Sequence, residues 1–126
     1  MPLDQTTPIL VVDDEPAMVK LMTSLLRVAG FEDIGSAVTA QDALVLLAQK
    51  AYEVVISDLH MPPTGGVQLL RSIRASSGQQ PKFILTTASR SPTDVAAAKH
   101  AGVDAYLLKP FTPAQLRAKL QEVFRT

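Results

Sequence analysis

Four short apolar runs and one weaker strand at residues 33–37, which contains Gly35 and is expected at the sheet edge, alternate with five segments of helical periodicity along the chain. The runs are rich in Val, Ile and Leu, and they lack the apolar–polar alternation of a strand with one face in water. Such runs are typical of strands buried on both faces of a parallel sheet. Because a helix between two parallel strands crosses back over the sheet, the pattern predicts an α/β fold with helices on both faces. The predicted strands cover residues 9–12, 33–37, 54–58, 83–85 and 104–108.

Capping residues mark where the predicted helices begin and end. Thr39, with Asp42 three residues later, resembles a helix-opening cap, and Pro92 and Pro113 suit the first turn of a helix. Gly30 follows the first apolar stripe, where helices commonly end in a left-handed residue. The stripes of the first three helices, expected to face the core, are Met18, Leu21, Met22, Leu25, Leu26 and Ala29; Ala40, Ala43, Leu44, Leu47 and Ala48; and Gly66, Leu69, Leu70 and Ile73.

Length and composition limit what the chain can be. Its 126 residues suit a single domain, and we expect one domain over residues 1–126 with no output domain after it. The absence of cysteine excludes disulfides, thiolate nucleophiles, Cys-ligated zinc and iron–sulfur clusters. A formal net charge of +0 predicts no attraction to nucleic acid or to a membrane surface. With no signal pattern and no bilayer-length apolar run, the expected location is a bacterial-type cytoplasm.

Polar side chains stand at the carboxyl ends of the predicted strands. Asp13 and Asp14 follow the first strand, Asp58 ends the third, Thr87 follows the fourth and Lys109 follows the fifth. Asp58 alone would be interpreted as a loop cap. A parallel sheet gathers its carboxyl ends along one edge, however, and ligands bind there in folds of this type. The five side chains are therefore predicted to form one site.

Electrostatics indicates what such a site needs. Two carboxylates about 4 Å apart repel each other by roughly 4 kcal/mol at an effective dielectric constant of about 20. Three carboxylates and one lysine leave a surplus of two negative charges, which one divalent cation would cancel. Oxygen ligands favour a hard ion, and a site with few carboxylates suits Mg²⁺. The alternative is that one carboxylate stays protonated.

The same groups suit phosphoryl transfer. The Asp58 carboxylate can attack phosphorus in line, while Lys109 and Mg²⁺ neutralise the incoming group and Thr87 donates its hydroxyl to a phosphoryl oxygen. The product would be an acyl phosphate, which adds negative charge and acceptor oxygens at the sheet edge.

Four motifs stand in order on these strand ends: Val11-Val12-Asp13-Asp14-Glu15, Val55-Ile56-Ser57-Asp58-Leu59-His60-Met61-Pro62, Thr87-Ala88 and Tyr106-Leu107-Leu108-Lys109-Pro110-Phe111. Together they resemble the signature of response-regulator receiver domains in the single-domain, CheY-like form, over roughly residues 9–124. The resemblance implies a flavodoxin-like (β/α)5 fold, with one five-stranded parallel sheet in the strand order 2-1-3-4-5. It also implies a role in two-component signal transduction.

The resemblance assigns roles to single residues. Asp58 matches the phosphoacceptor, and Asp13 and Asp14 match the acidic pair that binds Mg²⁺. Asp58 and the backbone carbonyl of His60 would complete the protein ligands. Lys109 matches the phosphate-binding lysine, and its peptide bond to the following proline is expected to be cis.

A switch and its partners follow from the same resemblance. Thr87 matches the hydroxyl that moves toward the phosphoryl group, and Tyr106 matches the aromatic residue that turns into the vacated space. The fourth helix, fifth strand and fifth helix would bind a downstream protein. The phosphoryl donor would be a sensor histidine kinase or a phosphotransfer protein. The domain would not be an enzyme, because it would catalyse only its own phosphorylation and dephosphorylation.

The chain departs from the family pattern near the acceptor. Thr64 and Gly65 stand where Met and Asp are common before the loop glycine, here Gly66, which leaves the start of the third helix open. His60 and Ser89 stand two residues after the acceptor and the switch threonine. We hypothesise that these two side chains set how fast water removes the phosphoryl group.

Two other functions fit part of the pattern. An aspartyl-phosphate-type phosphatase would also place Asp and Lys on strand ends, but that class expects a second acid where His60 stands. A receiver-like module that binds partners without phosphorylation is the other alternative. Dinucleotide binding is excluded, because no Gly-x-Gly-x-x-Gly follows the first strand.

Overall fold

The structure is a computed structural model that describes residues 4–61, 64–76, 78, 80–88 and 91–124. These residues form a parallel sheet of five strands in the order β2-β1-β3-β4-β5. The strands are β1 (Ile9–Val12), β2 (Ile34–Ala37), β3 (Val54–Asp58), β4 (Lys82–Thr87) and β5 (Ala105–Leu108). The helices between and after them are α1 (Pro16–Val28), α2 (Ala40–Gln49), α3 (Gly66–Ala75), α4 (Pro92–Ala101) and α5 (Pro113–Phe124). The flavodoxin-like fold and its strand order are thereby confirmed.

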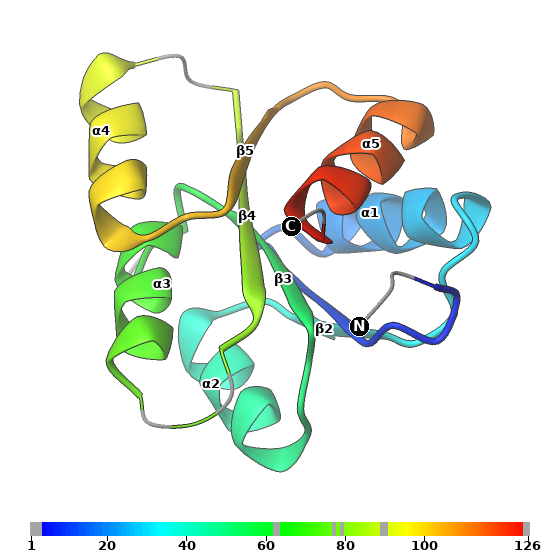
Figure 1. Ribbon diagram of the computed structural model, residues 1–126, viewed down its shortest axis with the longest axis horizontal. Coiled ribbons are helices and arrows are strands. Elements are labelled where there is room, and N and C mark those ends of the chain that lie inside the picture. The colour runs from blue at the N-terminus through cyan, green and yellow to red at the C-terminus, as the bar shows by residue number, and fades with distance from the viewer. Residues whose placement is uncertain (1–3, 62–63, 77, 79, 89–90, 125–126) are drawn as a thin grey trace.

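Helices cover both faces of the sheet, with α1 and α5 on one side and α2, α3 and α4 on the other (Figure 1). Successive residues of a strand point to opposite faces, so each strand supplies two cores. In β1, Ile9 and Val11 join the core beneath α1 and α5, whereas Leu10 and Val12 join the core beneath α2 and α3. All four side chains are buried, which explains why the run shows no polar alternation.

The helix boundaries follow the predicted caps. The Thr39 hydroxyl accepts a hydrogen bond from the Asp42 amide at 3.0 Å at the start of α2. Gly30 has φ +104° after α1, and Gly102 has φ +94° after α4, so both occupy the left-handed region predicted for a closing residue. The strands differ from the predicted ranges at their ends, since β4 extends to Thr87 and β2 and β5 each begin one residue later.

The predicted inward stripes of α1 and α2 are partly wrong. Leu21 is 51% exposed, and Leu44 and Ala48 lie on the solvent side of α2. In their place Leu46, together with Leu47, packs against the core beneath α2. Residues 43–48 are apolar without interruption, so their sequence does not specify which side of the helix faces the sheet.

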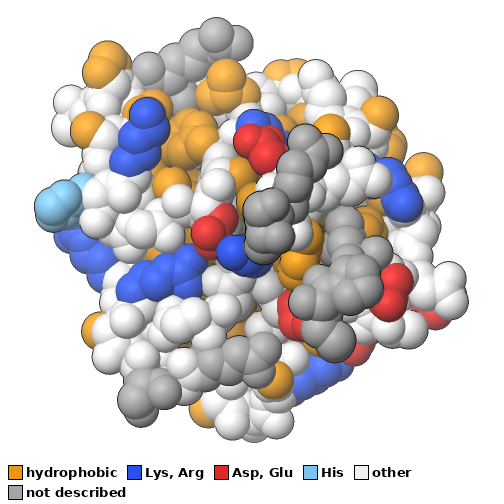
Figure 2. All heavy atoms as spheres, viewed as in Figure 1, with side chains coloured by type: hydrophobic (Ala, Val, Ile, Leu, Met, Phe, Trp, Pro, Cys, Tyr) orange, Lys and Arg blue, Asp and Glu red, His pale blue; other side chains and the backbone are white. Residues whose placement is uncertain are grey.

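The surface carries charges of both signs. On the face shown in Figure 2, basic and acidic side chains are scattered among apolar and uncharged ones, and neither sign forms a patch across that face. Among the helices within the described ranges, none combines the length and the hydropathy needed to cross a bilayer.

Candidate functional site

Three carboxylates meet where β1 and β3 end. β3 terminates in Asp58, while Asp13 and Asp14 directly follow the neighbouring strand β1. Each of the three offers one carboxylate oxygen, and these three oxygens lie within 4.8 Å of one another. The Asp13 side chain is buried, and its Oδ1 accepts a hydrogen bond from the Glu15 amide at 3.0 Å, which fixes its direction.

Lys109 reaches this cluster from the end of β5. Its Nζ lies 3.3 Å from Asp13 Oδ2 and 3.3 Å from Asp58 Oδ1, so one ammonium group from the end of β5 bridges two carboxylates at the ends of β1 and β3. The Lys109 amide also donates to the carbonyl of Thr87 at 2.8 Å, which holds the ends of β4 and β5 together. The peptide bond between Lys109 and Pro110 is cis, as the resemblance implies.

The charge balance of the cluster suits a hard cation. Burial raises the pKa of Asp58, and the negative charges of Asp13 and Asp14 raise it further, while Lys109 opposes the shift. One lysine therefore does not fully compensate the three carboxylates. Because the available side-chain donors are carboxylate oxygens, they fit Mg²⁺ better than a softer metal.

Mg²⁺ should stabilise the protein, and Asp58→Asn should reduce that gain. At a free Mg²⁺ concentration of a hundred times Kd, the free energy of unfolding should rise by about 2.7 kcal/mol. In EDTA, without the ion, we expect Asp58→Asn to be more stable than the native chain. The raised pKa of Asp58 makes the native folded state lose stability as pH rises through that pKa, and the asparagine variant avoids this loss. Its advantage should therefore be present at neutral pH and shrink on acidification below the raised pKa.

Thermal unfolding of both proteins in EDTA and in MgCl₂, at neutral and acidic pH, measures these differences. Asp42→Asn is the matched control, since Asp42 is exposed on α2, away from the cluster. Equal stabilisation of all three proteins by Mg²⁺ would show that the ion does not bind at Asp58.

Thr87 and Tyr106 lie on the paired strands β4 and β5. Thr87 is buried at the end of β4, and the Tyr106 hydroxyl is buried with no hydrogen-bond partner among the described residues. Burial raises the pKa of Tyr106, the charge of Asp94 on α4 adds to the increase, and the nearby Thr87 side chain opposes it. The two predicted switch residues are thus neighbours, and Asp94 of α4 lies close enough to influence Tyr106.

The start of α3 packs directly onto the end of β3. The Gly66 amide donates to the Leu59 carbonyl at 3.0 Å, and a Cβ added to Gly66 would lie 2.4 Å from the Asp58 carbonyl oxygen. Only glycine allows this approach without movement. The sequence showed the glycine but not the contact, which depends on where α3 begins.

His60 lies on the side of the site that faces α4. Its Nε2 lies 3.5 Å from Asp94 Oδ2, and its side chain is largely exposed. This contact joins the loop after β3 to α4, and the sequence alone gave no sign of it. The role of the His60 carbonyl in metal binding stays a prediction, and Ser89 lies outside the described residues.

Comparison with known proteins agrees with this geometry. Residues 9–121 match the family model described as the response regulator receiver domain. The chain is 34% identical over 123 residues to chemotaxis protein CheY-3 of Vibrio cholerae, covering 97% of this chain and 95% of that protein. It is 32% identical over 117 residues to chemotaxis protein CheY of Pseudomonas aeruginosa, covering 92% and 94%.

A solved structure shows the same fold. The crystallised chemotaxis protein CheY4 of Vibrio cholerae superposes with a TM-score of 0.87 at 29% identity, covering 94% of this chain and 99% of that one. Receiver domains of this CheY-like kind are in general signal transducers of two-component systems rather than enzymes. The chain belongs to the response regulator receiver domain family.

Proposed function

We propose that Asp58 accepts a phosphoryl group from the phosphohistidine of a sensor histidine kinase or of a phosphotransfer protein. The observation that carries this proposal is the position of Lys109 Nζ, 3.3 Å from both Asp58 and Asp13 at the carboxyl edge of the sheet. A partly exposed carboxylate beside a fixed ammonium group can meet a dianionic donor from solvent. Acidic residues alone would repel that donor.

The reacting groups have separate tasks. An Asp58 oxygen attacks phosphorus in line, an O–P bond forms, and the P–N bond to the donor histidine breaks. Lys109 pairs with the phosphoryl oxygens, and Thr87 donates its hydroxyl to one of them. Asp13, Asp14, Asp58 and the His60 carbonyl would hold Mg²⁺. When bound, the ion supplies positive charge that offsets the charge of the phosphoryl group.

The phosphorylated form would signal through α4, β5 and α5. Tyr106 belongs to this region and lines a groove of about 630 Å³ with residues of β5 and α5, including Gln115 and Lys119. Movement of Thr87 toward the phosphoryl group would leave room for Tyr106 to turn further inward, which changes this groove. We assign the downstream partner to that face. We also propose that residues 1–126 act as one receiver domain and that the protein works in the cytoplasm.

Incubation with acetyl phosphate and Mg²⁺ tests the proposal. Intact-mass measurement should show one added phosphoryl group on the native chain and none on Asp58→Asn, because the nucleophilic oxygen is lost. Asp42→Asn, an exposed carboxylate on another element, should be labelled like the native chain.

Three results would contradict the proposal. Labelling that survives Asp58→Asn would place the acceptor elsewhere. An unlabelled native chain would favour a module that binds without phosphorylation. Fast repeated hydrolysis of small phosphate esters would instead favour an aspartyl-phosphate-type phosphatase.

A further inference from the structure

α4 buries little apolar surface of its own. In this helix, which the structure describes throughout, Ala98 is the only buried residue, whereas α3 buries five residues, among them Leu69 and Ile73. An alanine side chain removes much less apolar area from water than a leucine or isoleucine does, so it contributes less free energy. Figure 1 shows α4 beside α3, on the face of the sheet opposite α1 and α5. The position of α4 therefore depends strongly on the contacts at its two ends.

Arg74 of α3 holds the carboxyl-terminal end of α4. Its Nε and Nη2 donate to the carbonyl of Gly102, the residue that closes α4, at 3.3 and 3.2 Å. Its Nη1 donates to the Pro81 carbonyl, before β4, at 2.8 Å, and Nη2 lies 2.9 Å from Asp104 Oδ2, before β5. The same Asp104 oxygen accepts a hydrogen bond from the Phe83 amide of β4 at 2.8 Å. One guanidinium group thus ties the end of α4 to the starts of two strands.

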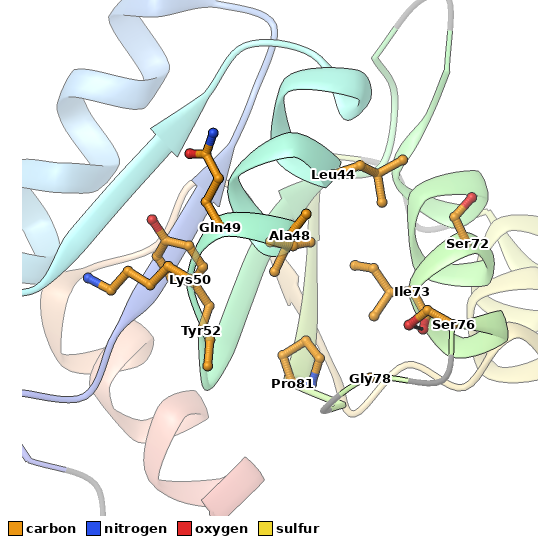
Figure 3. Close-up of a pocket in the computed structure, with 12 residues that line it drawn as sticks. Leu44, Ala48, Gln49, Lys50, Tyr52, Ser72, Ile73, Ser76, Gly78 and Pro81 are labelled. Atoms are coloured by element: carbon orange, nitrogen blue, oxygen red, sulfur yellow. Dashed lines mark hydrogen bonds between the residues drawn. The ribbon is translucent and has the colours of Figure 1, made fainter.

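The end of α3 that carries Arg74 is itself fixed. Gln80 Nε2 donates to the Ile73 carbonyl at 2.8 Å and to the Ser76 carbonyl at 3.1 Å. Figure 3 shows Ile73, Ser76 and Pro81 around a groove of about 500 Å³ that separates this end of α3 from α2. Since α3 leaves a groove toward α2 but forms several hydrogen bonds toward α4, Arg74 provides a firm attachment point for α4.

The amino-terminal end of α4 is held through Asp94, in its first turn. Asp94 Oδ2 lies 3.5 Å from Nε2 of His60, in the loop after β3, and we call this contact the α4 latch. The His60 side chain is 66% exposed, against 24% for the Arg74 side chain. Because exposed ion pairs contribute little free energy, the α4 latch is easier to break than the contacts of Arg74.

We propose that α4 pivots about Arg74 and that the α4 latch holds its other end in the resting position. What opens the latch rests on the proposed function, since His60 follows Asp58 by two residues. A phosphoryl group on Asp58 would bring negative charge and acceptor oxygens beside this loop, and those oxygens would compete with Asp94 for the imidazole. Opening of the α4 latch would release the first turn of α4, while Arg74 keeps Gly102 in place.

This motion would act on the face to which we assign the downstream partner. α4 has ten residues and is therefore about 15 Å long, so a rotation about Arg74 moves its first turn most and its last turn least. Phosphorylation would thereby change the α4–β5–α5 face at the end of α4 that contacts the loop after Asp58. His60, Asp94 and Arg74 would be positioning residues for α4.

Distances between spin labels on the full chain measure this motion. The chain has no cysteine, so introduced cysteines are the only labelling sites. Thr93→Cys reports the latched end of α4 and His100→Cys the pivoting end, and each is paired with Val28→Cys on α1; all three positions are exposed. Without phosphorylation, His60→Ala should change the mean Thr93–Val28 distance by about 2 Å, the scale of helix shifts in allosteric transitions, and leave the His100–Val28 distance unchanged.

Matched variants test each end of α4. His100→Ala removes the other histidine, which is exposed on α4, and should leave the Thr93–Val28 distance at its native value. Arg74→Met keeps the apolar stem but removes the guanidinium group, so the His100–Val28 distance should change as well. Arg71→Met, at an exposed position of α3, should change neither distance. Circular dichroism should show that the labelled variants are folded.

An unchanged Thr93–Val28 distance in His60→Ala would overturn the proposal. So would an equal change at both ends of α4, since the helix would then shift as a whole. A folded Arg74→Met variant with an unchanged His100–Val28 distance would place the pivot elsewhere.

Addition of acetyl phosphate and Mg²⁺ separates this proposal from the proposed function. Where intact mass shows the added phosphoryl group, the Thr93–Val28 distance should change as it does in His60→Ala, and an unchanged distance would contradict opening of the α4 latch. A chain that takes up no phosphoryl group would refute phosphorylation of Asp58. The distances in unphosphorylated His60→Ala would still decide whether α4 pivots.

Discussion

Lys109→Met should slow phosphorylation of Asp58 by acetyl phosphate by about a hundredfold or more. Methionine keeps most of the side chain's length and apolar stem but removes the ammonium group that lies 3.3 Å from Asp58 and Asp13. Loss of one preorganised charge-stabilising donor typically costs about 10²–10³ in rate. Here the loss also leaves three carboxylates facing an anionic donor with no cation from the protein.

The rate of appearance of the phosphorylated mass at saturating Mg²⁺ measures this effect. Lys99→Met is the matched control, because Lys99 is exposed on α4, outside the cluster. A rate for Lys109→Met within a few-fold of the native rate would show that the ammonium group does not act on the phosphoryl group. The assignment of Lys109 would then be wrong even if Asp58 remained the acceptor.

Gly66→Ala should lower the free energy of unfolding by about 2 to 3 kcal/mol. The new Cβ would lie 2.4 Å from the Asp58 carbonyl oxygen and 2.7 Å from Leu85 Cδ2, so either α3 or β3 must move. The carbonyl belongs to a central strand paired on both sides and cannot yield as a flexible side chain does. Because the displaced backbone carries Asp58, the proposed acceptor, phosphorylation should slow as well.

Urea denaturation with a two-state fit measures the first effect, and the mass-based labelling assay measures the second. Gly78→Ala is the matched control, since a Cβ at Gly78 would meet no atom within 4 Å. Its change in free energy should stay within about 0.5 kcal/mol. Equal stability of Gly66→Ala and the native chain would mean that α3 can begin elsewhere without cost.

The sequence predicted the fold well because its strands and caps are local signals. The apolar runs specify buried strands, and Thr39 and Gly30 specify helix ends, with φ +104° at Gly30 as expected. The gathering of Asp13, Asp58 and Lys109 also followed from the sequence, since parallel strands place their carboxyl ends at one edge.

What the sequence did not predict depends on contacts between elements. The outward position of Leu44 could not be inferred, because the surrounding residues are all apolar and the phase of the helix is set by packing against the sheet. The contact between Gly66 and the Asp58 carbonyl requires the position of α3, and the pairing of His60 with Asp94 requires that of α4. Single positions in the sequence carry no signal for such distances.

The ion pair between Lys109 and Asp13 joins residues separated by 96 positions in the chain. β1 and β5 are not neighbours in the sheet, so this pair can form only after β3 and β4 have taken their places between them. In a nascent chain still on the ribosome, with β5 inside the exit tunnel, Asp58 would lack the ammonium group of Lys109 beside it. Such a chain could not accept a phosphoryl group efficiently. If Asp58 is the acceptor, as we propose, the ability to receive a phosphoryl group would therefore arise only when the last strand is in place.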